Sequence, residues 1–187
     1  PNPSTLKFLP GQDVLGGASR SVAREFTVAE AARASPLAEA LFAVDGVTRV
    51  YLGTDFVSVT KTDDADWAYL KPFLLGAIMD HFVSGRPMFI EGDSDAAAPD
   101  APGHYEGEAA EIVEQITQLI ETRVRPAVAQ DGGDITFHSW VHEQGLVRLR
   151  MRGACAGCPS STLTLKQGIQ NMLRHYVPEV RAVEQVI

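Results

Sequence analysis

Two cysteines, Cys155 and Cys158, are the residues of this chain best suited to carry chemistry, and the chain has no other cysteine. Their Cys-x-x-Cys spacing lets both sulfurs bind one metal ion or one cluster. The same spacing is typical of a dithiol that cycles with a disulfide, and a purely structural pair is the third possibility. The spacing alone favours metal binding and redox chemistry equally.

The residues around the pair predict a reactive loop. The segment Gly153-Ala-Cys155-Ala-Gly-Cys158-Pro-Ser-Ser161 is expected between a strand and a helix, with Cys158 close to the helix start. Unpaired N–H groups at a helix start carry partial positive charge, which favours a thiolate. We expect Arg150, Arg152 and Lys166 to act in the same direction. Thiolates are the form of cysteine that binds iron and zinc.

The number of ligands predicts an assembly of more than one chain. A complete zinc or iron–sulfur site usually has four protein ligands, and this chain supplies two cysteines. Two chains that meet at their loops would supply four thiolates. We therefore expect a homodimer or higher oligomer with the metal at its interface. A cluster held half by each chain is exposed and can leave when the chains part, which suits a carrier.

The elements that position this loop are predicted in the second half of the chain. The segment Asp131-Gly-Gly-Asp134 is expected to be a turn, in preference to a metal- or phosphate-binding loop. Tyr176 is expected on the buried stripe of the last helix. The predicted elements are a helix at Glu108–Ala129, strands at Ile135–Val141 and Leu146–Met151, a helix at about 160–176 and a last strand at Val180–Val186.

The chain is predicted to have two domains. Residues 92–105 are rich in Ala, Pro, Gly and Asp and read as a flexible linker between residues 1–91 and residues 106–187. In the first domain, Asp64 and Asp66 are candidate caps for a helix that ends near His81, and Pro72 is expected to delay its start. The fold class is α+β, with two small domains that each pack helices on a short, largely antiparallel sheet. Strands are expected at Thr5–Phe8, 22–26, Val47–Leu52 and Phe56–Thr60.

Composition excludes several functions. The net charge of -8 argues against a nucleic-acid partner, because phosphate binding depends on clustered Lys and Arg. The apolar runs are too short to span a membrane, and the first thirty residues show no secretory signal. No Ser/His/Asp set, phosphate-binding glycine loop or paired acidic site is visible, so we do not expect an enzyme. Surface or core roles are expected of the histidines: His81, His104, His138, His142 and His175.

The motifs resemble a known family. Asp131-Gly-Gly-Asp-Ile135, the Gly153–Ser161 segment and Val177-Pro-Glu-Val180 are similar to the C-terminal domain of the NifU family, over residues 108–187. Residues 1–90 resemble the N-terminal domain of Nfu-type proteins. The pieces that carry this second likeness are Pro1-Asn-Pro-Ser-Thr-Leu-Lys-Phe8, Ser35-Pro-Leu37 and Val47-Thr-Arg-Val-Tyr-Leu52.

This resemblance implies a scaffold or carrier for iron–sulfur clusters. The chain would bind a [4Fe–4S] cluster between two subunits through Cys155 and Cys158 and transfer it to apo-proteins. Upstream assembly proteins would load it, in the cytoplasm of a bacterium or the mitochondrial matrix of a eukaryote. Two alternatives stay open: a thiol–disulfide oxidoreductase, and an adaptor whose first domain recognises clients while zinc joins the dimer. Zinc is also an adventitious occupant of such thiolates.

Overall fold

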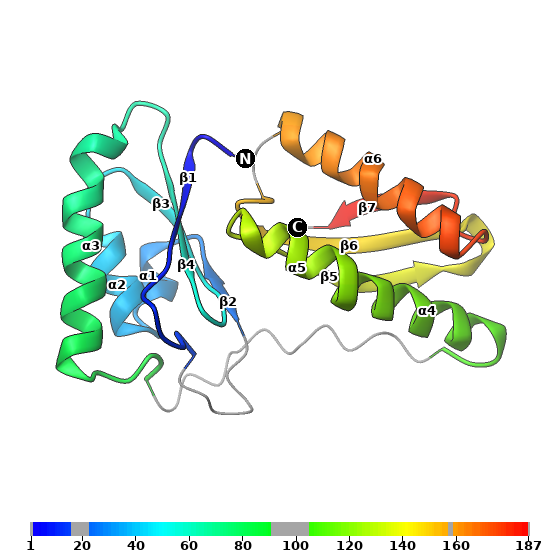
Figure 1. The fold of residues 1–187 in the computed structure, drawn as a ribbon, viewed down its shortest axis with the longest axis horizontal. Coiled ribbons are helices and arrows are strands. Elements are labelled where there is room, and N and C mark those ends of the chain that lie inside the picture. The colour runs from blue at the N-terminus through cyan, green and yellow to red at the C-terminus, as the bar shows by residue number, and fades with distance from the viewer. Residues whose placement is uncertain (1, 16–22, 91–104, 157–158, 187) are drawn as a thin grey trace. The chain divides into compact units, whose positions relative to one another are not determined.

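The computed structural model describes residues 2–15, 23–90, 105–156 and 159–186, without the side chains of residues 159–162. The chain divides between Ala97 and Ala98 into two compact units, each with its own core. Each unit is a small sheet covered by helices (Figure 1), which confirms the predicted α+β class. The predicted linker at 92–105 lies almost wholly outside the described residues, so its boundaries stay a prediction.

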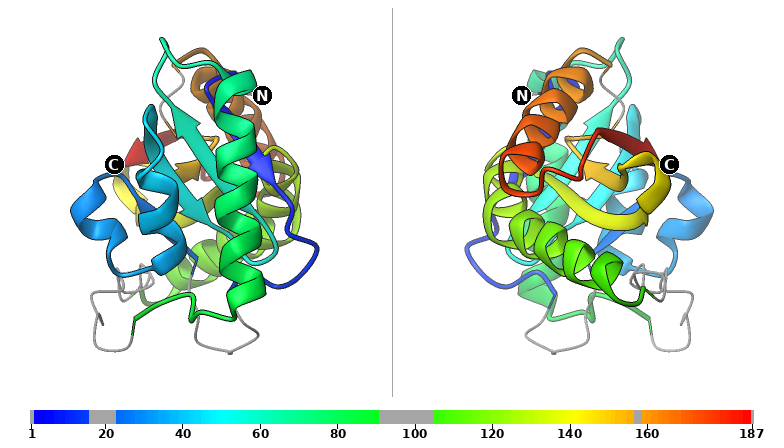
Figure 2. Two further views of the ribbon diagram at one scale, coloured as in Figure 1. Left: turned by 90° about the vertical axis from the view of Figure 1, so that its left-hand side faces the viewer. Right: turned by 90° about the vertical axis from the view of Figure 1, so that its right-hand side faces the viewer.

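The N-terminal unit is built on an antiparallel sheet with the strand order β1-β4-β3-β2. Three helices accompany it, and α3 lies in front of the sheet in the left view of Figure 2. The strands are β1 (Thr5–Phe8), β2 (Arg24–Phe26), β3 (Val47–Leu52) and β4 (Val57–Lys61), and the helices are α1 (Ala29–Ala32), α2 (Pro36–Phe42) and α3 (Trp67–Ser84).

Helix α3 begins earlier than the sequence predicts. Asp66 accepts a hydrogen bond from the Ala68 N–H at 2.9 Å, and the helix runs from Trp67 to Ser84 with Pro72 inside it. The prediction that Pro72 delays the start is therefore wrong. The Asp66 cap and the burial of Leu70 one turn later stabilise the first turn, and the proline ring lies on the exposed side.

The C-terminal unit has a three-stranded sheet in the order β5-β6-β7. β5 and β6 are antiparallel, whereas β7 runs parallel to β6 because α6 carries the chain back across the sheet. The helices cover one face (Figure 2, right). The elements are α4 (Glu108–Leu119), a π-helical turn η1 (Ile120–Val124), α5 (Arg125–Gln130), β5 (Gly133–Val141), a 3₁₀ turn η2 (His142–Gln144), β6 (Leu146–Gly153), α6 (Pro159–Tyr176) and β7 (Ala182–Val186).

A π-helical turn interrupts the helix that the sequence predicts as regular from Glu108 to Ala129. Pro126 has no N–H to donate to the carbonyl of Thr122, and its ring crowds that carbonyl. One turn earlier, the Thr122 hydroxyl donates to the Gln118 carbonyl at 2.7 Å. The widened turn at Ile120–Val124 accommodates both features and sets the direction of α5.

Tyr176 is not part of the core, which corrects the predicted stripe of α6. Its side chain is 44% exposed, and the guanidinium of Arg123 lies 4.9 Å from the centre of its ring. Ile169 and Leu173 are the α6 residues that are buried, as predicted. Within the described part of the chain, no helix combines the length and the apolar character needed to cross a bilayer.

Candidate functional site

Cys155 lies in a tight turn that follows β6. Backbone hydrogen bonds close the turn, from Cys155 N–H to the Arg152 carbonyl at 3.3 Å and from Ala156 N–H to the Gly153 carbonyl at 3.1 Å. Gly153 adopts φ 60, a conformation that residues with a side chain rarely take. Cys158 and the side chains of the following residues up to Thr162 lie outside the described structure. The predicted position of Cys158 at the start of α6 therefore stays a prediction.

The turn at Asp131 and Gly132 is hydrogen-bonded to the cysteine turn. The Ala154 N–H donates to the Gly132 carbonyl at 3.1 Å, and Gly132 has φ 79. The predicted turn at Asp131–Asp134 is shorter than expected: Asp131 and Gly132 form the turn, and Gly133 and Asp134 are the first residues of β5. The hydrogen bond between this turn and the cysteine turn was not predicted from the sequence. This bond joins the start of β5 to the end of β6.

Gly133 provides the space for the Cys155 thiol. A Cβ atom at position 133 would overlap Cys155 Sγ, and it would lie 3.0 Å from the Cys155 backbone nitrogen and 3.2 Å from Cys155 Cβ. Gly133 also pairs with Gly153 across the β5–β6 ladder. The two consecutive glycines are the sequence feature that could have indicated this contact. Gly132 permits the turn, and Gly133 permits the close approach of the Cys155 thiol.

Arg125 fixes the acidic end of the turn. Its Nε donates to Asp134 Oδ1 at 2.7 Å and its Nη2 donates to Asp134 Oδ2 at 3.1 Å, which makes a bidentate pair. Asp134 is buried, and its Oδ1 also accepts from the Ile135 N–H at 2.9 Å. Burial lowers the pKa of Arg125, but bonding and attraction to Asp134 and then Glu121 outweigh this and raise it. The pair ties α5 to the start of β5, beside the cysteine turn.

The surroundings of Cys155 do not favour its thiolate, and the thiolate predicted at the helix start concerns Cys158, which lies outside the described residues. Its side chain is 7% exposed, and burial raises the pKa of the thiol to about 12, with the negative charges of Asp134 and Asp131 acting in the same direction. The cause is position: the thiol faces the acidic Asp131–Asp134 turn and the core. The expected influence of Arg150, Arg152 and Lys166 is not seen at this cysteine.

No further ligand joins Cys155 in the described residues. Across these parts of the chain, no three His, Cys, Asp or Glu side chains come close enough to hold a metal ion. His81 is buried in the N-terminal unit, and its pKa is lowered by burial and then by Arg86. His138 and His142 lie on β5 and on the turn after it. The structure therefore brings none of these histidines into a set of ligands.

The arrangement limits what the site can do. One thiol is held in a defined position by backbone contacts, glycine and a buried ion pair, and it is protonated at neutral pH. A metal or cluster that binds Cys155 must displace its thiol proton. Such a loop can accept a soft metal, but by itself a single chain offers two thiols at most.

Comparison with known proteins identifies both units. Residues 116–184 match the NifU-like domain, and residues 1–85 match the family described as scaffold protein Nfu/NifU N terminal. The chain is 50% identical over 185 residues to NifU-like protein 5, mitochondrial, of Arabidopsis thaliana, covering 99% of this chain and 65% of that protein. It is 47% identical over 186 residues to the NFU1 iron-sulfur cluster scaffold homolog, mitochondrial, of Drosophila persimilis, covering 100% of this chain and 62% of that protein.

A solved structure is also similar. The solution NMR structure of a NifU-like protein from Saccharomyces cerevisiae is 26% identical, with a TM-score of 0.42, and the match covers 49% of this chain and 79% of that one. The chain spans less than two thirds of the length of the two curated relatives described above. Because both domain families match and the curated relatives align over the full chain, this chain belongs to the NifU-like family, with an Nfu-type N-terminal domain followed by a NifU-like domain.

Proposed function

We propose that this chain is an iron–sulfur cluster carrier, which binds a [4Fe–4S] cluster between the Cys155 and Cys158 thiolates of two subunits and passes it to apo-proteins. The observation that carries the proposal is the incomplete ligand set: two cysteines in the whole chain, one of them held in a built turn. The Drosophila relative named as an iron-sulfur cluster scaffold supports the same role.

The ligand set fits a shared cluster better than a resident one. A [4Fe–4S] cluster takes four cysteine thiolates, so two chains complete it and half of the ligands leave when the chains separate. The cluster is then cargo, and the partners are proteins that supply it and apo-proteins that receive it. The role is binding and transfer without catalysis. The mitochondrial names of the relatives favour the mitochondrial matrix for a eukaryotic chain, and the bacterial cytoplasm is the alternative.

The site must change on loading. Cys155 is buried against Gly133, and its thiol is protonated at neutral pH. The turn opens when the cluster arrives, because four sulfurs from two chains cannot meet while one of them points into a core. The glycines at 132, 133 and 153 give the two touching turns the backbone freedom for this movement.

Anaerobic reconstitution with iron and sulfide tests the proposal. We expect a broad visible absorption, about two iron and two sulfide per chain, and a dimer in solution. Cys155→Ser and Cys158→Ser should each abolish the cluster without unfolding the protein, and Ser139→Ala is a matched control on β5 that should load fully. A full cluster in either cysteine variant would refute the proposed ligands.

Two further assays separate the alternatives. A metal-free monomer that reduces protein disulfides with turnover would identify a thiol–disulfide oxidoreductase. Zinc that iron and sulfide cannot displace, at one ion per two chains, would identify a zinc-joined adaptor. We expect neither result, and we expect the loaded protein to activate an apo-protein that needs a [4Fe–4S] cluster.

A further inference from the structure

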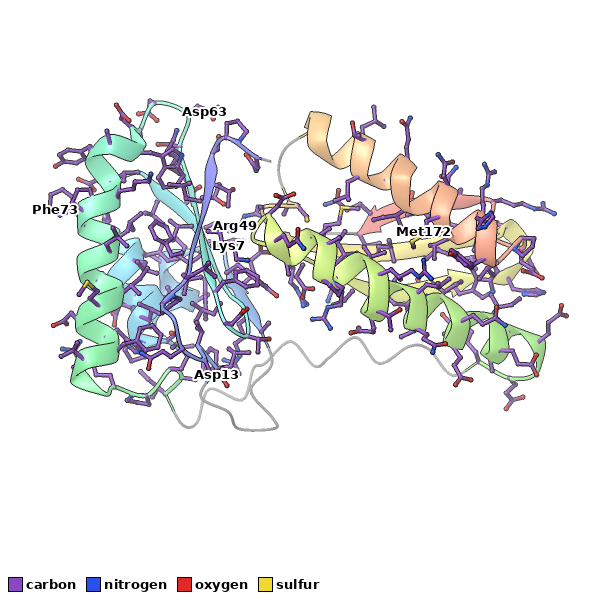
Figure 3. The ribbon with its side chains drawn as sticks, in the orientation of Figure 1. Lys7, Asp13, Arg49, Asp63, Phe73 and Met172 are labelled. Atoms are coloured by element: carbon purple, nitrogen blue, oxygen red, sulfur yellow. The ribbon has the colours of Figure 1, made fainter. Side chains whose placement is uncertain are left out.

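The sheet of the C-terminal unit has an open face, opposite the face on which the described helices pack. Met172 of α6 packs against the core on the helix side (Figure 3). Side chains along a strand alternate between the two faces. The core side of β6 buries Val147, Leu149 and Met151. The open face therefore receives three half-buried side chains of the middle strand, which we call the arginine row: Arg148, Arg150 and Arg152.

The arginine row carries more positive charge than the strands beside it balance. Asp134 of β5 lies opposite Arg152, but both of its carboxylate oxygens accept from Arg125. Glu184 of β7 lies opposite Arg148 and contacts it at 3.2 Å. The side chains of that pair are 51% and 41% exposed, and exposed pairs of this kind are weak. A positive strip therefore remains on a chain whose net charge is -8.

A buried hydroxyl beside the row has no hydrogen-bond partner in the described part of the chain. Thr136 of β5 lies opposite Arg150, so the two side chains share the open face. Thr136 Oγ1 is buried and makes no hydrogen bond there. Buried hydroxyls are normally hydrogen-bonded, so this one is explained by an acceptor that the chain itself does not supply. A carboxylate bound between Arg150 and Thr136 would accept from both.

We infer that the arginine row docks an acidic segment of the apo-protein that receives the cluster. Planar guanidinium groups bind carboxylates through two parallel hydrogen bonds, which a lysine cannot make. Alternate residues of a strand are about 6.7 Å apart, and alternate carboxylates of an extended segment have the same spacing. The row therefore fits a segment with Asp or Glu at every second position.

The place of the row in the fold favours a recipient of the cluster, and this choice rests on the proposed function. β6 ends at Gly153, and the cysteine turn that holds Cys155 follows it directly. A protein that takes a cluster from this turn lies beside Arg152, the last arginine of the row. A second copy that met the row about a two-fold axis would bring like charges together. The net charge of -8 opposes a nucleic acid.

Peptide binding tests the row in the full chain without metal. The protein is the Cys155→Ser/Cys158→Ser variant, and the probe is a fluorescein-labelled peptide of alternating glutamate and threonine. Fluorescence anisotropy should show binding at least ten-fold tighter than that of a glutamine–threonine control peptide at low salt. The affinity should fall at least ten-fold at about 0.15 M salt, because exposed charges are then screened. Equal binding of the two peptides would overturn the inference.

Matched charge variants in the same background assign the binding to the row. Arg148→Gln/Arg150→Gln should weaken binding of the acidic peptide at least ten-fold. Arg123→Gln/Arg174→Gln removes the same charge from exposed positions on the helices of the same unit, and it should change the affinity less than two-fold. Arg152→Gln, which keeps the contact between Arg148 and Glu184, should weaken binding at least three-fold. Equal losses in the two double variants would overturn the inference.

Two further probes exclude other occupants of the row. This chain has its own alternating carboxylates at Glu91, Asp93 and Asp95. Glu91→Gln/Asp93→Asn/Asp95→Asn should change peptide affinity less than two-fold, and an affinity at least ten-fold higher would identify that segment as the occupant. An oligo(dT) of equal charge should bind more weakly than the acidic peptide. Tighter binding of the oligo(dT) would assign the row to a nucleic acid. Either contrary result overturns the choice of a recipient protein.

Cluster transfer tests the recipient itself, in chains that keep both cysteines. With an apo-protein that needs a [4Fe–4S] cluster, Arg148→Gln/Arg150→Gln should transfer at least ten-fold more slowly at low recipient concentration, with its iron content per chain unchanged. The control is again Arg123→Gln/Arg174→Gln. Equal transfer rates for the two loaded variants would overturn the inference. A chain that never takes up iron would refute the proposed function instead, and the peptide assay does not depend on that result.

Discussion

Gly133 and the Cys155 thiol lie so close that no other amino acid fits at position 133 without moving the cysteine. A Cβ there would overlap Sγ, and it would be 3.0 Å from the backbone nitrogen of Cys155. The crowding atoms belong to a turn that hydrogen bonds hold in place, from Ala154 N–H to the Gly132 carbonyl among them. The position of the proposed ligand is therefore set by a glycine on a different strand.

Gly133→Ala should displace the cysteine turn. We expect the free energy of unfolding of the C-terminal unit to fall by about 1–3 kcal/mol, as for overpacking at other crowded sites, and cluster retention to fall with it. Gly168→Ala is the control, because its added methyl meets open space and should raise helix stability by up to about 1 kcal/mol. Urea unfolding followed by the fluorescence of Trp140, in a Trp67→Phe background, measures both. Equal stabilities for the two alanine variants would contradict the packing described here.

The Arg125–Asp134 pair should matter more than the neighbouring Arg125–Glu121 pair. Arg125→Ala removes the bidentate guanidinium from the buried Asp134 carboxylate, and we expect a loss of about 1.5–3 kcal/mol, because the arginine itself is partly exposed. Glu121→Gln removes the negative charge from an exposed i,i+4 pair with Arg125 and should cost no more than about 0.5 kcal/mol. The same urea assay applies. A loss for Glu121→Gln as large as that for Arg125→Ala would show that the buried pair is not the principal link.

The buried thiol predicts a dependence of stability on alkaline pH. Burial, and then Asp134 and Asp131, raise the pKa of Cys155 from its ordinary 9.0 to about 12 in the folded protein. The unfolded chain therefore loses its thiol proton first as pH rises. The contribution of this thiol to stability is fully present below pH 9 and is lost between about pH 9 and 12, at most about 4 kcal/mol over the window.

Two variants isolate this thiol from the other groups that titrate in the same range. Cys158→Ser retains Cys155, and Cys155→Ser/Cys158→Ser lacks it, so the difference between their unfolding free energies reports Cys155. We expect that difference to shrink as pH rises through the window, and alkylation of Cys155 at pH 8 to be much slower in the folded than in the unfolded chain. A pH-independent difference, together with fast alkylation, would mean that the thiol is exposed.

The two separate cores predict that the C-terminal unit works alone. Every buried residue of its core comes from residues 112–183, so a fragment of residues 98–187 should fold. We expect it to bind iron and sulfide in the same ratio per chain as the full protein. A fragment that cannot be reconstituted would show that the N-terminal unit contributes to the cluster site.

Much of the architecture could be predicted from the sequence, because the hydrophobic periodicity of each segment agrees with the capping and turn residues at its ends. Asp66 caps α3, the strands expected at Thr5–Phe8 and Val47–Leu52 form at those residues, and the helix expected at about 160–176 runs over Pro159–Tyr176. Pro72 misled the prediction because tertiary burial of Leu70 and Leu74 outweighs one missing hydrogen bond. The π-turn at Ile120–Val124 has no periodic signature, since it depends on how Pro126 is accommodated.

The candidate site was predictable in its residue types and not in its environment. The spacing of Cys155 and Cys158 pointed to thiol chemistry, and the pair remains the proposed ligand set. The sequence could not show that Cys155 faces Asp134 and Gly133, because that contact joins residues about twenty positions apart through the register of β5 and β6. Charge along the chain, from Arg150 and Arg152, therefore says nothing of the burial and the acidic neighbours that raise the pKa of Cys155.

The burial of Cys155 has a consequence for the life of the chain between cargoes. Peroxide oxidises thiolates first, to sulfenic acid and then to sulfinic and sulfonic acids, of which the last cannot be reversed. A thiol that is 7% exposed and protonated at neutral pH reacts slowly on this path. In the proposed carrier role, a sulfur held against Gly133 would keep the empty chain competent under oxidative stress.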